Sequence, residues 1–171
     1  LWSSELDDLP PFLYGGSMIE TVTMTAATWA PAPRKFEAGV PNMAQAVGLG
    51  AALDYLTALG MSHVHNHEVL LTKYLIEKLL QVPELKIVGP TNLDSRGGTV
   101  SFTVGEIHPH DLGQYVDSQG VAVRTGHHCA WPLTRKLGVP ATTRASLYLY
   151  NEESDCDALF DAILGAQKYF A

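Results

Sequence analysis

The stretch Gly98-Thr99-Val100-Ser101-Phe102-Thr103-Val104 decides the fold class, because it is the strongest strand candidate in the chain. Its β-branched and aromatic side chains favour a pleated, half-buried strand. Three weaker strand candidates lie at 85–88, 121–124 and 144–150. Helices are expected at 109–118 and from a cap at Asn151 to about Tyr169. Strands that alternate with helices over short connections predict an α+β fold, a small sheet with helices packed on it.

Two further helices are expected before this region. The first runs from a cap at Asn42 to Leu59 and ends at Gly60. Its side chains are apolar around nearly the whole circumference, so we expect it to lie buried. The second begins near a cap at Ser62. Its apolar face should meet the core and carries Val64, Leu71, Leu75 and Leu79.

The first forty residues have the pattern of extended chain and turns. Residues 18–24 alternate between apolar and polar side chains, which predicts a strand or hairpin arm. The proline-rich break at 30–33 predicts a domain boundary, with 1–31 in one domain and 32–171 in another. Residues 34–41 are expected to be extended. The chain starts without methionine, and we expect it to be a fragment of a longer protein.

Composition excludes several function classes. The chain has 171 residues, 46% of them hydrophobic, which suits one compact domain with or without part of another. Its net charge of −7 makes nucleic acid and anionic membranes poor partners. No apolar run reaches the roughly 18–20 residues of a membrane span. The two cysteines form no disulfide framework, so we expect reduced thiols and a cytoplasmic protein.

Cysteine chemistry is the first candidate for function. Cys129 follows His127 and His128, and Arg124 lies five residues upstream. A thiolate is the reactive form of cysteine, and neighbouring positive charge favours it. Either imidazole could accept the thiol proton. The alternative is a small buried cysteine with no chemical role, and the spacing alone leaves both interpretations open.

Two arginines are candidates for binding a carboxylate. Arg144 interrupts a strand of small and apolar residues, and Arg124 ends the strand that leads to Cys129. An arginine fork matches a carboxylate in two parallel hydrogen bonds, as an amino or keto acid substrate requires. Each arginine could instead be a solvated edge residue or a member of a structural ion pair.

Metal binding is not favoured by the histidine spacing. His63 and His67 share a helix face, but no carboxylate or cysteine completes a standard ligand set. His108 and His110 stand at a helix start, where capping or packing is the commoner role. Cys156 falls on the inward face of the last helix, and we expect it in the core.

Several stretches resemble the group II cysteine desulfurases, the SufS-like branch. They are Arg-Thr-Gly-His-His-Cys-Ala at 124–130, Arg-Ala-Ser-Leu-Tyr-Leu-Tyr-Asn at 144–151, Arg-Lys-Phe-Glu-Ala-Gly-Val-Pro-Asn at 34–42 and the apolar stretch 47–56. The resemblance covers essentially all of the chain, in order and with nearly constant spacing.

This resemblance implies the small C-terminal domain of a fold-type I enzyme dependent on pyridoxal 5'-phosphate, in the class V aminotransferase family. Such enzymes are homodimers with active sites at the subunit interface. They take sulfur from L-cysteine, release alanine and hold the sulfur as a persulfide for iron–sulfur cluster assembly. The implied sulfur acceptor is a protein of the SufE or the zinc-containing SufU type.

The resemblance also implies residue roles. Cys129 matches the nucleophile that attacks the sulfur of the substrate. Arg144 matches the residue that grips the substrate carboxylate, and Arg124 matches a second arginine near that group. His127 and His128 would lie near the active site. These roles come from the match to the family and not from spacing.

Other positions match more weakly or not at all. His110 matches a position that reaches the metal of a zinc-containing acceptor. Val40 stands where relatives have a threonine that touches the cofactor phosphate across the dimer. None of the lysines at 35, 73, 78, 86, 136 and 168 lies in the family's Schiff-base motif. We therefore expect residues 1–31 to be the tail of the large cofactor-binding domain, and the fragment to be inactive alone.

Two other functions fit the same residues. A selenocysteine lyase or another class V aminotransferase relative would keep the fold and change the substrate. A non-catalytic carrier or scaffold domain would only accept a persulfide on Cys129. The missing lysine favours a carrier for the fragment, whereas Arg144, which a carrier does not need, favours an enzyme for the parent protein.

Overall fold

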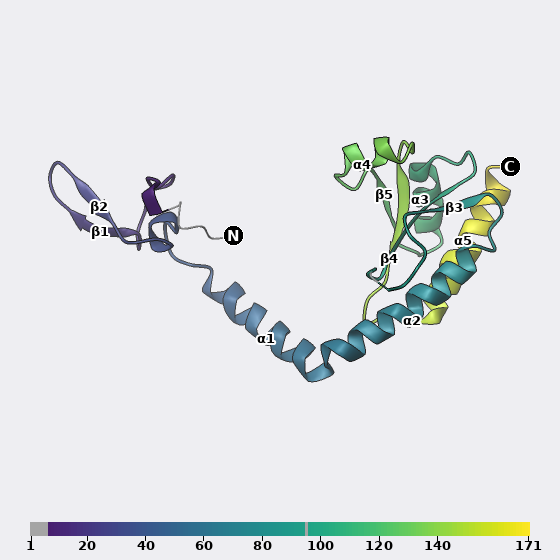
Figure 1. Cartoon of the computed structure of the whole chain (residues 1–171), viewed down its shortest axis with the longest axis horizontal. Coiled ribbons are helices and arrows are strands. Elements are labelled where there is room, and N and C mark those ends of the chain that lie inside the picture. The colour runs from purple at the N-terminus through teal and green to yellow at the C-terminus, as the bar shows by residue number, and fades with distance from the viewer. Residues whose placement is uncertain (1–6, 95) are drawn as a thin grey trace. The chain divides into compact units, whose positions relative to one another are not determined.

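The computed structural model describes residues 7–94 and 96–171 (Figure 1). The chain divides into two compact units between residues 56 and 57, inside a helix. This division by packing differs from the predicted boundary at 31/32. The assignment of 1–31 to a large domain and 32–171 to a small one concerns the intact protein and stays a prediction.

The second unit contains a four-stranded antiparallel sheet in the order β3-β4-β6-β5. The strands are β3 (Leu85–Val88), β4 (Thr99–Val104), β5 (Arg124–Gly126) and β6 (Thr142–Ser146). The predictions at 85–88 and 98–104 are confirmed. So is the α+β class, because helices separate β4, β5 and β6 in the chain and helices pack on the sheet (Figure 1).

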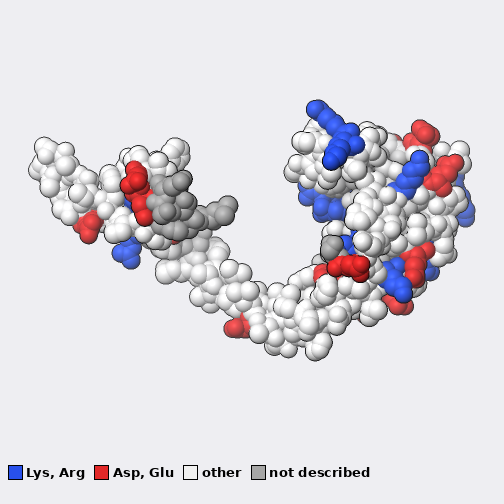
Figure 2. All heavy atoms as spheres, in the orientation of Figure 1, with Lys and Arg blue, Asp and Glu red and all other residues white. Residues whose placement is uncertain are grey.

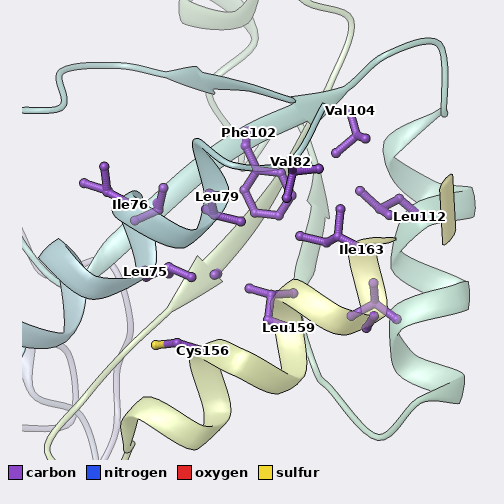
Figure 3. Close-up of a cluster of buried hydrophobic side chains, with 14 of the residues drawn as sticks. Leu75, Ile76, Leu79, Val82, Phe102, Val104, Leu112, Cys156, Leu159 and Ile163 are labelled. Carbon is purple, nitrogen blue, oxygen red and sulfur yellow. The ribbon is translucent and has the colours of Figure 1, made fainter. Parts of the chain in front are cut away.

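Three helices supply the rest of the core, and a fourth, short helix follows the thiol turn, the turn at residues 127–130 that carries Cys129. They are α2 (Met61–Leu79), α3 (Pro109–Ser118), α5 (Glu153–Tyr169) and the short α4 (Trp131–Lys136). In Figure 3, Phe102 of β4 points among Leu79, Val82 and Ile163. The predicted face of α2 is confirmed, because Val64, Leu71, Leu75 and Leu79 are all buried.

Two predicted strands, at 121–124 and 144–150, differ from the observed strands in their bounds. Residues 121–123 only pack beside the core, and pairing with β6 begins at Arg124. β6 ends at Ser146 because the Asn151 side chain accepts from the Tyr148 N–H at 2.9 Å and closes a turn there. Asn151 is therefore not the cap of α5. Glu152 is, in a capping box with Asp155.

The ends of the helices agree with the predictions more closely than the ends of the strands do. α3 spans the predicted 109–118, with Pro109 at its start and the His108 side chain accepting from the His110 N–H. α2 begins one residue before the predicted Ser62 cap. Gly60, at φ 83°, takes the left-handed conformation that separates α2 from the helix before it.

The first unit is small and mostly exposed. β1 (Ile19–Val22) pairs antiparallel with β2 (Ala27–Trp29), which confirms the predicted hairpin arm. The prediction of extended chain at 34–41 is wrong at its start, because Arg34–Phe36 forms the 3₁₀ turn η2. Met18 and Ala30 are buried, and the Ala30 N–H donates to the Met18 carbonyl at 2.9 Å.

Helix α1 (Met43–Leu59) has the predicted bounds but not the predicted burial. None of its residues is buried, and Val47 and Leu49 are 74% and 62% exposed. Apart from Asp54 it carries no charge, and Figure 2 shows it almost wholly white. The apolar pattern correctly predicted a helix, but the described part of this chain does not bury its apolar side chains. In those same described residues, no helix is long and apolar enough to cross a membrane.

Candidate active site

The pairing of β5 with β6 brings the two predicted arginines together. In this register Arg124 is directly opposite Arg144, and Arg144 is in turn opposite Ser101 of β4. Alternate residues such as Ala145 and Val100 are buried in the core, so the arginine row lies on the other face of the sheet. Arg144 is partly buried and Arg124 is exposed.

Among the described residues, neither arginine of this pair forms a salt bridge. Like charges directly opposite on neighbouring strands are unfavourable. The Arg144 Nε atom is buried and has no hydrogen-bond partner among the described residues. A buried donor without an acceptor costs stability, so the arrangement suits an anion that supplies the acceptors. A carboxylate has the matching fork.

His128 lies against the same pair. Its Nε2 atom and Thr142 Oγ1 are hydrogen-bonded at 2.8 Å, while its Nδ1 atom is buried without a partner among described residues. Burial lowers the pKa of His128, and the charge of Arg144 lowers it further, with a smaller effect from Arg124. The neutral imidazole is therefore the favoured form near neutral pH, and it can accept a proton at one ring nitrogen.

Cys129 follows on a strained turn. Gly126 has φ 117°, and His128 and Cys129 have φ 53° and 61°. The left-handed region is unfavourable for residues with a side chain, at about 1–3 kcal/mol each. The Ala130 N–H donates to the His127 carbonyl at 2.9 Å and closes the turn. The turn leaves Cys129 exposed, so the buried alternative for this cysteine is wrong.

His127 contacts an aromatic residue just beyond the turn. Its ring stacks on the Trp131 indole, with centroids 3.9 Å apart and planes 12° from parallel. The Arg135 guanidinium lies 5.5 Å from the same indole centroid. Sequence reasoning did not single out Trp131, although it lies only two residues after Cys129. Only the turn brings residues 127 and 131 into contact.

The two weaker candidates differ in where they lie. His110 is exposed in the first turn of α3, beside an open groove of about 410 Å³ that Thr125 also lines. A Cβ at Gly126 would lie 3.8 Å from His110 Nε2, so His110 is near the start of the thiol turn. Val40 is exposed in the first unit, and the structure does not relate it to Cys129.

Cys156 and the other histidines form no second centre among the described residues. Cys156 is 1% exposed in the core, as predicted, and burial raises the pKa of its thiol to about 11. Across residues 7–94 and 96–171, no three His, Cys, Asp or Glu side chains lie close enough to hold a metal ion. His67 instead contacts the Asn151 carbonyl through Nε2 at 3.0 Å.

The sequence pattern of the family described as aminotransferase class-V matches residues 1–159. The chain therefore belongs to the class V aminotransferase family. A probable cysteine desulfurase of Streptomyces coelicolor is 56% identical to it over 172 residues, which is 99% of this chain and 41% of the relative. A cysteine desulfurase of Haloferax volcanii is 49% identical over 97% of this chain and 39% of its own length.

Solved structures give the same likeness. The apo cysteine desulfurase of Thermococcus onnurineus NA1 matches with a TM-score of 0.86 and 36% identity, over 96% of this chain and 42% of that one. The cysteine desulfurase CsdA of Escherichia coli, in an S-sulfonic acid form, matches with a TM-score of 0.84 and 32% identity, over 96% and 40%. The chain thus spans about two fifths of the length of these relatives.

Membership of the class V aminotransferase family implies pyridoxal phosphate as the cofactor of the intact protein. Among the described residues, the unpartnered Arg144 Nε and the arginine pair suit a carboxylate, and the thiol of Cys129 is exposed. No lysine lies in β5, in the thiol turn or in β6, all of which the structure describes. The lysine that would bind the cofactor has no counterpart among these elements.

Proposed function

We propose that this chain is the thiol-bearing part of a cysteine desulfurase of the SufS-like group II. The observation that carries the proposal is the geometry of one short region. Cys129 is exposed on the turn that leaves β5, the strand on which Arg124 pairs with Arg144, and the buried Arg144 Nε has no hydrogen-bond partner among the described residues. A thiol that must receive sulfur needs access, and an amino acid substrate needs its carboxylate held.

In the proposed reaction each residue has one task. Arg144 and Arg124 hold the carboxylate of L-cysteine and so orient its sulfur toward the turn. A bond forms between Cys129 Sγ and the substrate sulfur while the substrate's carbon–sulfur bond breaks, and a proton added at that carbon completes alanine. Pyridoxal phosphate, when bound, supplies the electron sink for this cleavage. His128, neutral beside the arginines, can take up the thiol proton.

The proposal includes the rest of the active site. The cofactor lysine belongs to polypeptide outside this chain, residues 1–31 to the large domain, and Val40 to a weak cofactor contact across a homodimer. The persulfide on Cys129 passes to an acceptor of the SufE or SufU type for iron–sulfur cluster assembly. His110, near the thiol turn, would meet that acceptor. A cytoplasmic location follows from the two reduced cysteines.

The test is alanine formation from L-cysteine by the protein with its cofactor, comparing wild type with Cys129→Ser. We expect the serine variant to lose activity by a factor of at least about 10³ while it keeps its cofactor absorbance, because serine is a far weaker acceptor for sulfur. Cys156→Ala, which removes the buried thiol, should keep the activity. Equal alanine formation by Cys129→Ser and wild type would contradict the proposal.

A persulfide carrier is the second candidate, because Cys129 is exposed and no lysine lies in the elements around it. A carrier accepts sulfur without holding an amino acid. Arg144→Gln would then leave persulfide uptake from a separate donor protein unchanged. In a desulfurase the same substitution raises the KM for L-cysteine strongly, by a factor of roughly 10–100 for the loss of a charge-assisted hydrogen-bonded pair.

A further inference from the structure

We infer that Trp131 is a positioning residue for Cys129, acting through a stack that spans the strained turn. This inference rests on the proposed function, because it concerns how the sulfur-accepting thiol is presented. Two left-handed residues, His128 and Cys129, follow each other, and residues with side chains avoid this region. Contacts on both sides must hold the turn in place.

Two side-chain contacts involve the residues of the turn. His128, the first residue of the left-handed pair, is hydrogen-bonded to Thr142 at 2.8 Å. The residue before the pair stacks on the second residue after it, with the His127 and Trp131 ring centroids 3.9 Å apart. Within the same segment, the Ala130 N–H donates a hydrogen bond to the His127 carbonyl.

The surroundings of Trp131 support a role other than core packing. Trp131 is 53% exposed, whereas a large aromatic side chain in a core is far more buried. The Trp131 indole contacts the His127 ring and the Arg135 guanidinium. Both the aromatic stack and the cation over a ring are favourable interactions. Trp131, the first residue of α4, is thereby in contact with His127, which directly follows β5 at the start of the thiol turn.

The distinguishing substitution is Trp131→Leu, with Trp131→Phe as the conservative variant. Leucine keeps an apolar side chain but has no ring to stack, whereas phenylalanine keeps one. Leu133→Ala is the matched control, because Leu133 lies on the same short helix and is 54% exposed. None of these residues touches the arginine pair in the contacts described above.

The first readout is hydrogen exchange of the Ala130 amide, measured by NMR on the protein. We expect exchange to accelerate about tenfold or more in Trp131→Leu and to remain near the wild-type rate in Trp131→Phe and Leu133→Ala. The imidazole protons of His127 should also lose the ring-current shift that the stacked indole gives them. Equal Ala130 exchange in wild type and Trp131→Leu would overturn the inference.

The second readout separates positioning from folding. In alanine formation we expect Trp131→Leu to lower kcat about tenfold with little change in the KM for L-cysteine, because a small displacement of a reacting atom is costly while the arginines still hold the carboxylate. Phenylalanine should restore most of kcat. An unchanged kcat would contradict positioning. If wild type forms no alanine, the proposed function fails, and the exchange comparison alone decides the role of Trp131.

Discussion

His128 shows how neighbouring charges act on a single residue at the site. Its imidazole is partly buried, and the charges of Arg144 and Arg124 both act on it. Burial and positive charge both penalise the protonated ring, so both lower its pKa. The folded-state pKa therefore lies below the unfolded value, and the unfolded chain binds the proton first as pH falls. His128 consequently destabilises the fold below about pH 6.5, where the unfolded imidazole becomes charged.

Removing one guanidinium should raise the pKa of His128. We expect a clear rise in Arg144→Gln and a smaller one in Arg124→Gln, because Arg144 has the larger effect. The measurement is an NMR titration of the His128 ring protons. Arg135→Gln removes the same charge from α4 and should leave the titration unchanged. A His128 curve that is identical in wild type and Arg144→Gln would show that the arginine does not face this ring.

At the scale of elements, the close approach of α3 and β5 positions the thiol turn. A Cβ built on Gly113 of α3 would lie 2.5 Å from Thr125 Cγ2 of β5, so glycine is needed for this spacing. Thr125 pairs with the buried Thr143, and both neighbours of Thr125 belong to the site. The close packing of α3 against Thr125 therefore helps to fix the position of β5.

Gly113→Ala should destabilise the second unit. Alanine favours a helix, but the clash with a β-branched side chain on a paired strand outweighs that gain, for a net loss of about 1–3 kcal/mol. The free energy of unfolding, measured in urea, reports it. Gly165→Ala in α5 is the control, because its new Cβ meets mainly the Tyr115 Oη atom at 2.8 Å, the far end of a side chain that can tilt away. A Gly113→Ala variant as stable as Gly165→Ala would contradict the tight packing.

For the molecule as a whole, the two units differ in how much apolar surface they cover. The second unit has a continuous core of residues from α2, α3, α5 and the sheet. The first unit ends in α1, where Leu49, Leu53 and Tyr55 are 62%, 56% and 60% exposed. Exposed apolar patches of this kind mark a surface that associates with something else.

The 171-residue chain alone should therefore self-associate. We expect Leu49→Glu with Leu53→Glu to lower the weight-average mass in sedimentation, because the two charges interrupt the apolar surface of α1. Gln45→Glu with Thr57→Glu adds the same charge on the same helix without removing apolar side chains, and should have a smaller effect. A wild-type chain that sediments as a monomer at high concentration would disprove the expectation.

The sequence by itself determined the elements whose signals are local. Pro109 and the following apolar spacing fix α3, β-branched runs fix β3 and β4, and Gly60 ends α1. Cys129 and the two arginines were also found from the sequence as candidates, through residue type and the family resemblance. These features depend on backbone preference and side-chain chemistry, which the sequence carries directly.

Only the tertiary structure decided the pairing and the exposure. The start of β5 and the end of β6 depend on which residues meet across the ladder, and so does the placing of Arg124 opposite Arg144. The contact of His127 with Trp131 needs two left-handed residues that no local propensity favours. The exposure of α1 depends on what else is present to cover it. Long-range contacts and solvent exposure are set only when the chain has folded. A periodic pattern identifies an apolar face but not the surface that covers it.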